Sequence, residues 1–85
     1  MEIAVAGPDC EDIIRSYAEK VPFPNYWQFN WNSFDECLRD SLARGMRLTA
    51  VHSFTAESLG ENSLYLDIIR DVSNDFDTFS YEFRR

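Results

Sequence analysis

Three short stretches of alternating apolar and polar residues lie far apart in the chain, and their separation most constrains the possible folds. Residues 2–6, 47–54 and 78–83 each show the two-residue period of a strand with one buried face. Two helical patterns separate the first stretch from the second, and one helical pattern separates the second from the third. Strands that are connected through helices run parallel by right-handed crossovers. We therefore expect an α/β fold with three parallel strands.

Alternation in the last stretch also predicts how the sheet is covered. Phe79, Tyr81 and Phe83 alternate with Ser80 and Glu82, whereas a parallel sheet covered on both faces shows continuous apolar runs. We expect the helices to pack mainly on one face and the other face to stay partly open. A chain of 85 residues has room for one small core, so residues 1–85 are expected to form a single domain.

The helical patterns have recognisable ends. The first follows Asp9, a good N-cap residue, and is expected to end before Pro22. The last is expected to begin at Asn62 and to end within residues 73–75. Residues 55–60 fit either a short helical turn or a loop, and both alternatives stay open.

The charge of the chain narrows the class of partner. Fifteen acidic and eight basic residues give a net charge of −7. Such a surface repels nucleic acid and anionic membranes, and it favours encounter with a cationic protein. The first residues lack the pattern of a signal peptide, and no apolar run reaches the length of a membrane span. We expect a cytoplasmic protein that binds neither nucleic acid nor membranes.

Residue types that can carry chemistry are present, but they do not form the patterns of catalytic or metal sites. His52 is the only histidine, and its place in a strand pattern favours a structural role. The three glycines are too far apart for a phosphate-binding loop. Cys10 and Cys37 lack the close spacing of a redox or zinc site and are predicted to be reduced thiols. We expect no enzymatic activity, no metal and no cofactor.

An aromatic loop precedes the second helical pattern. Six of the thirteen aromatic residues lie between positions 23 and 34. Asn30 or Ser33 can serve as the N-cap of the helix, and Ser33 with Glu36 fits a capping box. One face of this helix is apolar, whereas the opposite face carries Glu36 and Asp40.

Two interpretations of this acidic helix face follow from the pattern. In the first, the face is only solvated, and the aromatic loop closes over the core. In the second, the carboxylates and the neighbouring Tyr26 and Trp27 form a docking surface, because tyrosine and tryptophan supply anchors at protein interfaces.

The same stretch resembles the signature segment of the barstar family, which comprises small intracellular inhibitors of secreted ribonucleases. The resemblance is carried by three runs: Pro24-Asn25-Tyr26-Trp27, Asn30-Trp31-Asn32 and Asp35-Glu36-Cys37-Leu38. The order of the expected strands and helices extends the likeness over the whole chain. The resemblance implies a three-stranded parallel sheet.

The resemblance also implies roles for individual residues. Tyr26 falls on the aromatic residue that lies against the ribonuclease, and Asn30 falls on the asparagine at the start of the helix. Glu36 falls on the acid that enters the ribonuclease active site. A weaker match places Asp71 on an acid at the rim of the interface.

Three positions depart from the family pattern. Asn32 replaces a second aspartate, Asp35 replaces a tryptophan, and Gln28 replaces a glycine. An inhibitor with one carboxylate fewer at this surface is expected to be fitted to a different nuclease.

The function that the resemblance implies is inhibition of a cationic ribonuclease or nuclease toxin domain. Acidic residues of the second helix and the flanking aromatics would block the active site, and the inhibitor would protect the cell that contains it. We expect a monomer when the protein is free. The residues expected to contact the partner are Tyr26, Trp27, Asn30, Trp31, Asn32, Asp35, Glu36, Asp40 and Asp71.

Two alternatives belong to other classes of protein. One is an adaptor with a barstar-like fold that binds a protein other than a nuclease, and Asn32 in place of the aspartate is its main support. The other is a structural subunit that self-associates through Tyr26, Trp27 and Phe29.

Overall fold

The three expected strands form one sheet, and apolar alternation decides which face they bury. The computed structural model describes residues 1–84. All strand pairs are parallel, and the second strand lies in the centre. The strands are β1 (Glu2–Val5), β2 (Leu48–His52) and β3 (Phe79–Phe83). In the register, Ala50 lies between Ile3 and Tyr81. The expected three-stranded parallel sheet is confirmed.

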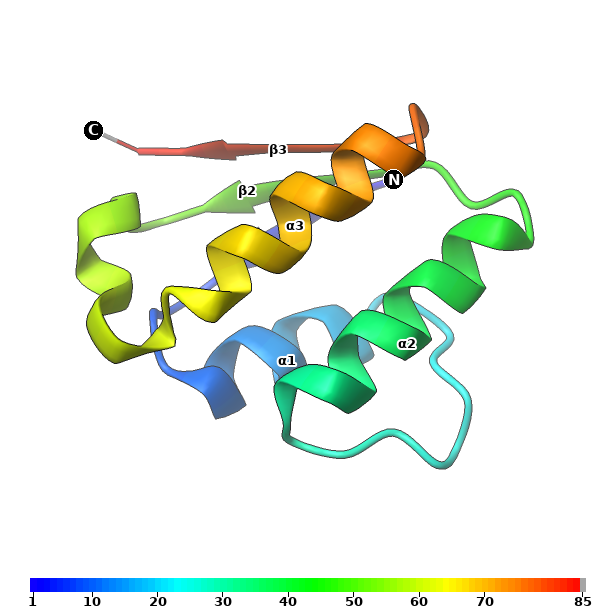
Figure 1. Cartoon of the computed structure of the whole chain (residues 1–85), viewed down its shortest axis with the longest axis horizontal. Helices are drawn as coiled ribbons and strands as arrows, with labels where there is room; N and C mark the ends of the chain where they lie inside the picture. Colours follow the sequence, from blue (N-terminus) through cyan, green and yellow to red (C-terminus); the bar gives the residue numbers. More distant parts are fainter. Residues whose placement is uncertain (85) are drawn as a thin grey trace.

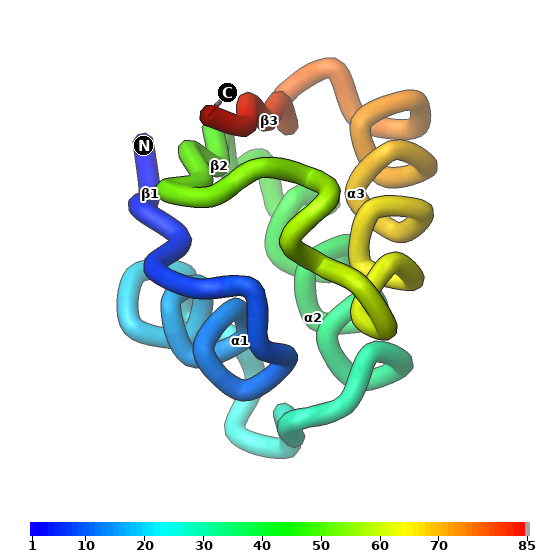
Figure 2. Tube along the Cα trace, turned by 90° about the vertical axis from the view of Figure 1, so that its left-hand side faces the viewer, coloured from blue at the N-terminus to red at the C-terminus, as the bar shows by residue number. Residues whose placement is uncertain are grey.

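The helices pack against one face of this sheet. They are α1 (Cys10–Ala18), α2 (Trp31–Ala43) and α3 (Leu64–Asp75), and a 3-10 helix, η1 (Ala56–Asn62), precedes α3. Figures 1 and 2 show α1, α2 and α3 on the same side of the strands, with α2 and α3 running in the same direction. The prediction of a small α/β domain covered mainly on one face is confirmed.

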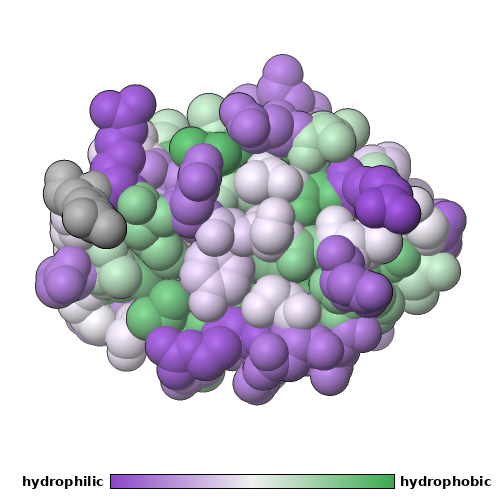
Figure 3. Space-filling view, turned by 90° about the horizontal axis from the view of Figure 1, so that it is seen from above, coloured by the Kyte–Doolittle hydropathy of each residue, from purple (hydrophilic) through white to green (hydrophobic). Residues whose placement is uncertain are grey.

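The other face of the sheet is open. Seen from this side, residues of hydrophilic or intermediate hydropathy, drawn in purple and near-white, lie between the hydrophobic residues, drawn in green (Figure 3). The hydroxyl oxygens of Thr49 and Ser80 lie 3.0 Å apart across β2 and β3. Ser80 and Glu82 are exposed, whereas Phe79 is buried and Tyr81 and Phe83 are half-buried. The alternation in the sequence therefore predicted both faces correctly.

The end of α1 lies before Pro22, as expected, but several residues ahead of the proline. The helix ends at Ala18 and does not continue to the residue before Pro22. The N–H groups of Lys20 and Val21 both donate to the carbonyl of Tyr17, at 3.1 and 2.7 Å. This tight turn closes the helix before the proline is reached.

The beginning of α3 differs from the sequence expectation. The sequence predicts that this helix begins at Asn62, but the helix begins at Leu64, and the Asn62 side-chain amide donates to the carbonyl of Pro8 at 3.2 Å. The ambiguous residues 55–60 fold mainly into η1, with Gly60 at a φ of 52°. Such a backbone angle suits glycine because other residues carry a Cβ that clashes there.

A chain of buried hydrogen bonds links the sheet to two helices. His52 of β2 has its Nδ1 2.8 Å from the carbonyl oxygen of Glu82 and its Nε2 2.6 Å from the hydroxyl of Tyr65. The carbonyl can only accept, so Nδ1 carries the proton and Nε2 accepts from Tyr65. The Tyr65 and Tyr17 hydroxyls lie 2.8 Å apart. His52 is a satisfied residue of the core, and its expected structural role is confirmed.

This arrangement predicts how stability changes with pH. Burial lowers the pKa of His52, against a smaller opposing effect of the Glu82 carbonyl. The unfolded chain, with a histidine pKa of about 6.5, therefore takes up the proton first as the pH falls. The free energy of unfolding should then decrease below about pH 6.5, by up to about 1.4 kcal/mol per pH unit. Urea unfolding between pH 8 and pH 5 measures this slope.

The matched control is His52→Gln. His52 is the only histidine in the chain, so the variant should show a much flatter slope between pH 7 and pH 5.5. An equal slope in both proteins would contradict the assignment to His52.

Candidate functional site

The loop between α1 and α2 is tied to the helix that follows it. The N–H of Gln28 donates to the hydroxyl of Ser33 at 2.8 Å. Within the loop, the N–H of Trp27 donates to the carbonyl of Pro24 at 3.1 Å, and the rings of Trp27 and Phe29 meet edge to face at 5.0 Å. These contacts give the aromatic loop a definite shape beside α2.

Asn30 is the N-cap of α2. Its side-chain oxygen accepts from the N–H of Ser33 at 2.8 Å. The capping box predicted for Ser33 and Glu36 is therefore wrong. The helix begins three residues earlier than that box requires, and the Ser33 hydroxyl accepts from Gln28. As a consequence, Glu36 has no capping role.

Trp31 begins α2 and packs between helices. Its ring stacks on Tyr65 of α3 at 5.3 Å and meets Phe34 edge to face at 5.8 Å. The side chain is half-buried, so only part of it is available to a partner. Trp27 is half-buried as well.

Two arginines neutralise most of the carboxylates along α2. Arg39 donates to Asp35 at 2.9 Å and to Asp75 of α3 at 2.6 Å. Arg44 lies 3.2 Å from Asp40. Asp35 and Asp40, two of the candidate residues, are thus engaged in ion pairs within the protein.

Glu36 differs from its acidic neighbours. Its side chain is exposed, and within residues 1–84 it makes no hydrogen bond or ion pair. Asn32, one turn earlier on the same helix, is exposed too. Glu36 is therefore the carboxylate of α2 whose charge stays available for a partner.

Tyr26 lies beside this acidic face. Its side chain is 56% exposed. The pKa of its phenol is raised, first by partial desolvation and then by the negative charges of Glu36 and Asp40, whereas Arg44 opposes the effect. The phenol of any tyrosine with a pKa near or above 10 is protonated at neutral pH, so this hydroxyl can donate. The structure thus brings Tyr26, Glu36 and Asp40 into one surface, which we call the acidic-aromatic surface.

Asp71 lies on the neighbouring helix. It is exposed on α3, one turn before Asp75, which reaches Arg39 of α2. Residues four apart share a helix face, so Asp71 is on the side of α3 that borders α2. Asp71 therefore borders α2 from the neighbouring helix, whereas Glu36 and Asp40 lie on α2 itself.

Sequence reasoning missed the contacts that decide which charges are free. The link from Arg39 to Asp75 joins residues 36 positions apart, and no local pattern reveals it. Asp40 and Arg44 have the i,i+4 spacing of ion pairs on a helix, so this pair could have been predicted from the sequence.

Other predicted properties can be compared with the described residues. Cys10 and Cys37 are free thiols, as expected. In residues 1–84, no group of three or more histidine, cysteine, aspartate or glutamate side chains is placed to hold a metal ion. Among the helices that the structure describes, none has both the length and the apolar character to cross a membrane.

Comparison with known proteins identifies one family. The family model described as Barstar (barnase inhibitor) matches residues 4–84, nearly the whole chain. Searches of curated proteins and of solved structures found no significant match.

The N-cap assignment leads to a prediction about stability. Asn30→Ala removes the side-chain acceptor for the Ser33 N–H and should lower the free energy of unfolding by about 1 kcal/mol. Asn32→Ala is the matched control on the exposed face of the same turn, and it should change stability by less than about 0.5 kcal/mol. Urea denaturation of the two variants measures both values. If Glu36→Ala lowered the free energy of unfolding as much as Asn30→Ala does, the result would support the capping box of Ser33 and Glu36.

Proposed function

We propose that this protein, which belongs to the barstar family, inhibits a ribonuclease by placing the Glu36 carboxylate in the cationic active site of the enzyme. The observation that carries the proposal is the free charge of Glu36. It is the exposed carboxylate of α2 that Arg39 and Arg44 leave unpaired, and Tyr26 stands beside it.

The chemistry of ribonucleases supports this role. An enzyme that cleaves RNA must gather arginine, lysine or histidine side chains around a phosphate. A carboxylate can replace that phosphate, because charge-assisted hydrogen bonds from cationic donors are short and strong. The phenol of Tyr26 adds a rigid aromatic side chain of the type that is enriched at interface centres.

The surface charge supports rapid binding. The net charge of −7 attracts a cationic enzyme over distances longer than a direct contact. Asp71, which borders α2 from the neighbouring helix, adds to this attraction. The partner in this proposal is a cationic ribonuclease or nuclease toxin domain, and the free inhibitor is a monomer.

The cellular role follows from the same proposal. An inhibitor of a secreted or toxin ribonuclease protects the cytoplasm in which it resides, because RNA there would otherwise be cleaved. Asn32 at the position of a family aspartate removes one negative charge from the surface. The cognate enzyme is therefore expected to present fewer cations at that point than the enzyme that the family is named for.

The central prediction concerns Glu36. Glu36→Ala should weaken inhibition of a barnase-type ribonuclease by about 2–5 kcal/mol of binding free energy, the range for loss of one member of a buried charge pair. That range rests partly on the prototype complex of this same family. The measurement is a titration of each protein into the enzyme while RNA cleavage is followed. Because Glu36 is exposed and makes no hydrogen bond or ion pair within residues 1–84, the fold should be retained.

The matched control is Glu82→Gln. It removes the same charge from an exposed position of β3 on the open face of the sheet, and should leave inhibition nearly unchanged. Equal weakening by both substitutions would show that only net charge matters, and the active-site role of Glu36 would be rejected.

A second prediction concerns Asp71 and salt. Asp71→Asn should slow association and flatten its salt dependence, with an effect on affinity of less than about 1 kcal/mol, because charges at an interface rim act mainly on the association rate. Stopped-flow association at low and high salt measures this. An effect of Asp71→Asn as large as that of Glu36→Ala would place Asp71 in the centre of the interface.

The adaptor alternative predicts that binding to the partner depends only weakly on salt, whereas binding to a ribonuclease through charges should weaken as the salt concentration rises. A well-folded protein that inhibits no ribonuclease, and that binds another protein with weak salt dependence, would favour an adaptor. The replacement of an aspartate by Asn32 is the sequence observation that supports it.

A further inference from the structure

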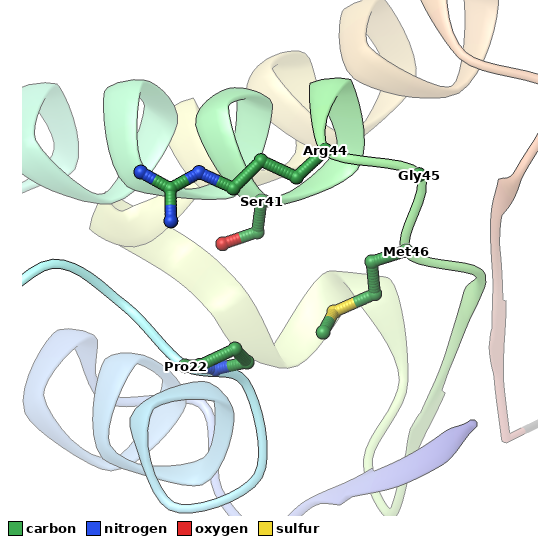
Figure 4. A pocket seen from close by; sticks show the side chains of 5 residues that line it. All are labelled: Pro22, Ser41, Arg44, Gly45 and Met46. Carbon is green, nitrogen blue, oxygen red and sulfur yellow. The ribbon is translucent and has the colours of Figure 1, made fainter.

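A pocket lies next to the acidic-aromatic surface, at the C-terminal end of α2. It has a volume of about 270 Å³. Figure 4 shows its walls, with α2 on one side and the segment after α1 on the other. The lining residues are Pro22, Ser41, Arg44, Gly45 and Met46.

The size of the pocket limits what it can hold. Sites for small molecules and cofactors usually occupy about 300–1,000 Å³. A pocket of about 270 Å³ lies below that range, and it is open to the surface. It suits a single side chain that a protein partner inserts, which is how anchor residues are bound at interfaces.

Three of the lining residues favour an aromatic side chain. Pro22 offers an apolar ring, and the Met46 side chain extends toward the space above it (Figure 4). The thioether of methionine makes favourable contacts with aromatic rings. Arg44 lines the same space, and its guanidinium can lie over a ring in a cation–π contact.

The fourth residue adds a polar acceptor. Ser41 is only 4% exposed, and its hydroxyl donates to the carbonyl of Cys37 at 3.0 Å. A hydroxyl that donates its hydrogen keeps lone pairs that can accept. Figure 4 shows this oxygen directed toward the space between α2 and Pro22. A phenol that enters between Pro22 and Met46 would find an acceptor there.

The pocket is continuous with the surface proposed to bind the ribonuclease. Arg44, which lines the pocket, forms the 3.2 Å ion pair with Asp40. Asp40 belongs to the acidic-aromatic surface together with Tyr26 and Glu36. One partner can therefore cover Glu36 and reach the pocket at the same time.

We propose that the pocket formed by Pro22, Ser41, Arg44 and Met46 binds a tyrosine side chain of the protein partner, with the phenol donating to the Ser41 hydroxyl. The identification of that partner as the inhibited ribonuclease rests on the function proposed above. The chemistry of the pocket itself does not depend on it.

The pocket can be tested without any partner. The probe is p-cresol, which has the structure of a tyrosine side chain, and toluene is the analogue without the hydroxyl. Titration of p-cresol should shift the backbone amide resonances of Gly45 and Met46 in two-dimensional NMR spectra. In the unaltered protein, p-cresol should bind about two- to tenfold more tightly than toluene, as expected for one hydrogen bond.

Two variants show whether the probe binds as proposed. Ser41→Ala should abolish the preference for p-cresol and leave the affinity for toluene unchanged, whereas Met46→Ala should weaken both probes. Ser58→Ala, an exposed serine in η1, is the control and should change neither. The proposal is overturned if p-cresol leaves Gly45 and Met46 unshifted, or if the preference survives in Ser41→Ala.

The ribonuclease titration separates this inference from the proposed function. Met46→Ala should raise the concentration needed for half inhibition several-fold, with Glu36 intact. Unchanged inhibition by Met46→Ala would overturn the role of the pocket in binding the enzyme. Absence of inhibition by the unaltered protein would count against the proposed function alone, and the p-cresol result would then decide whether the pocket is a phenol site.

Discussion

Tyr65 is the side chain on which the arrangement of the layers depends. Its hydroxyl bonds to Tyr17 of α1 and to His52 of β2, and its ring stacks on Trp31 of α2. One residue of α3 therefore contacts both other helices and the central strand. A packing that left one of these buried polar groups without a hydrogen-bond partner would lower the stability of the fold by about 1–3 kcal/mol. The chain of hydrogen bonds therefore allows few alternative arrangements of the helices and the sheet. Because the contact with Trp31 fixes α2 beside α3, Tyr65 also sets where Glu36 stands relative to Asp71.

The ion pairs around α2 matter more for recognition than for stability. Arg39, Arg44 and their carboxylate partners are all partly exposed, and such pairs contribute only about 0–1 kcal/mol each. Their effect on the surface is larger. Arg39 and Arg44 offset two of the three negative charges on Asp35, Asp40 and Asp75, so Glu36 is the carboxylate of α2 that has no ion-pair partner within residues 1–84. A partner with a single cationic cavity fits that distribution better than a partner with an extended basic surface.

The sequence predicted those features that depend on local periodicity. Alternation of apolar residues in Phe79–Phe83 was enough to identify a strand with one open face, and helical spacing placed Glu36 on the face of α2 opposite the apolar one, where its side chain is exposed. Contacts between distant residues could not be predicted in this way. Arg39 has acidic residues at several helical spacings, and only the packing of α3 against α2 decides that Asp75 takes part. The pocket likewise needs Pro22 and Met46 together, which no pattern in either segment indicates.

The aromatic loop illustrates how packing prepares a surface for binding. Arg15 of α1 lies over the ring of Phe29 at 5.2 Å, and Ser33 of α2 accepts from Gln28. The loop is therefore held from both sides, by the helix before it and by the helix after it. Ordering a mobile side chain at an interface costs about 0.5–1.5 kcal/mol, and a loop that is already held avoids much of that cost. Within the loop, the rings of Trp27 and Phe29 contact each other, whereas Tyr26 is exposed next to Glu36.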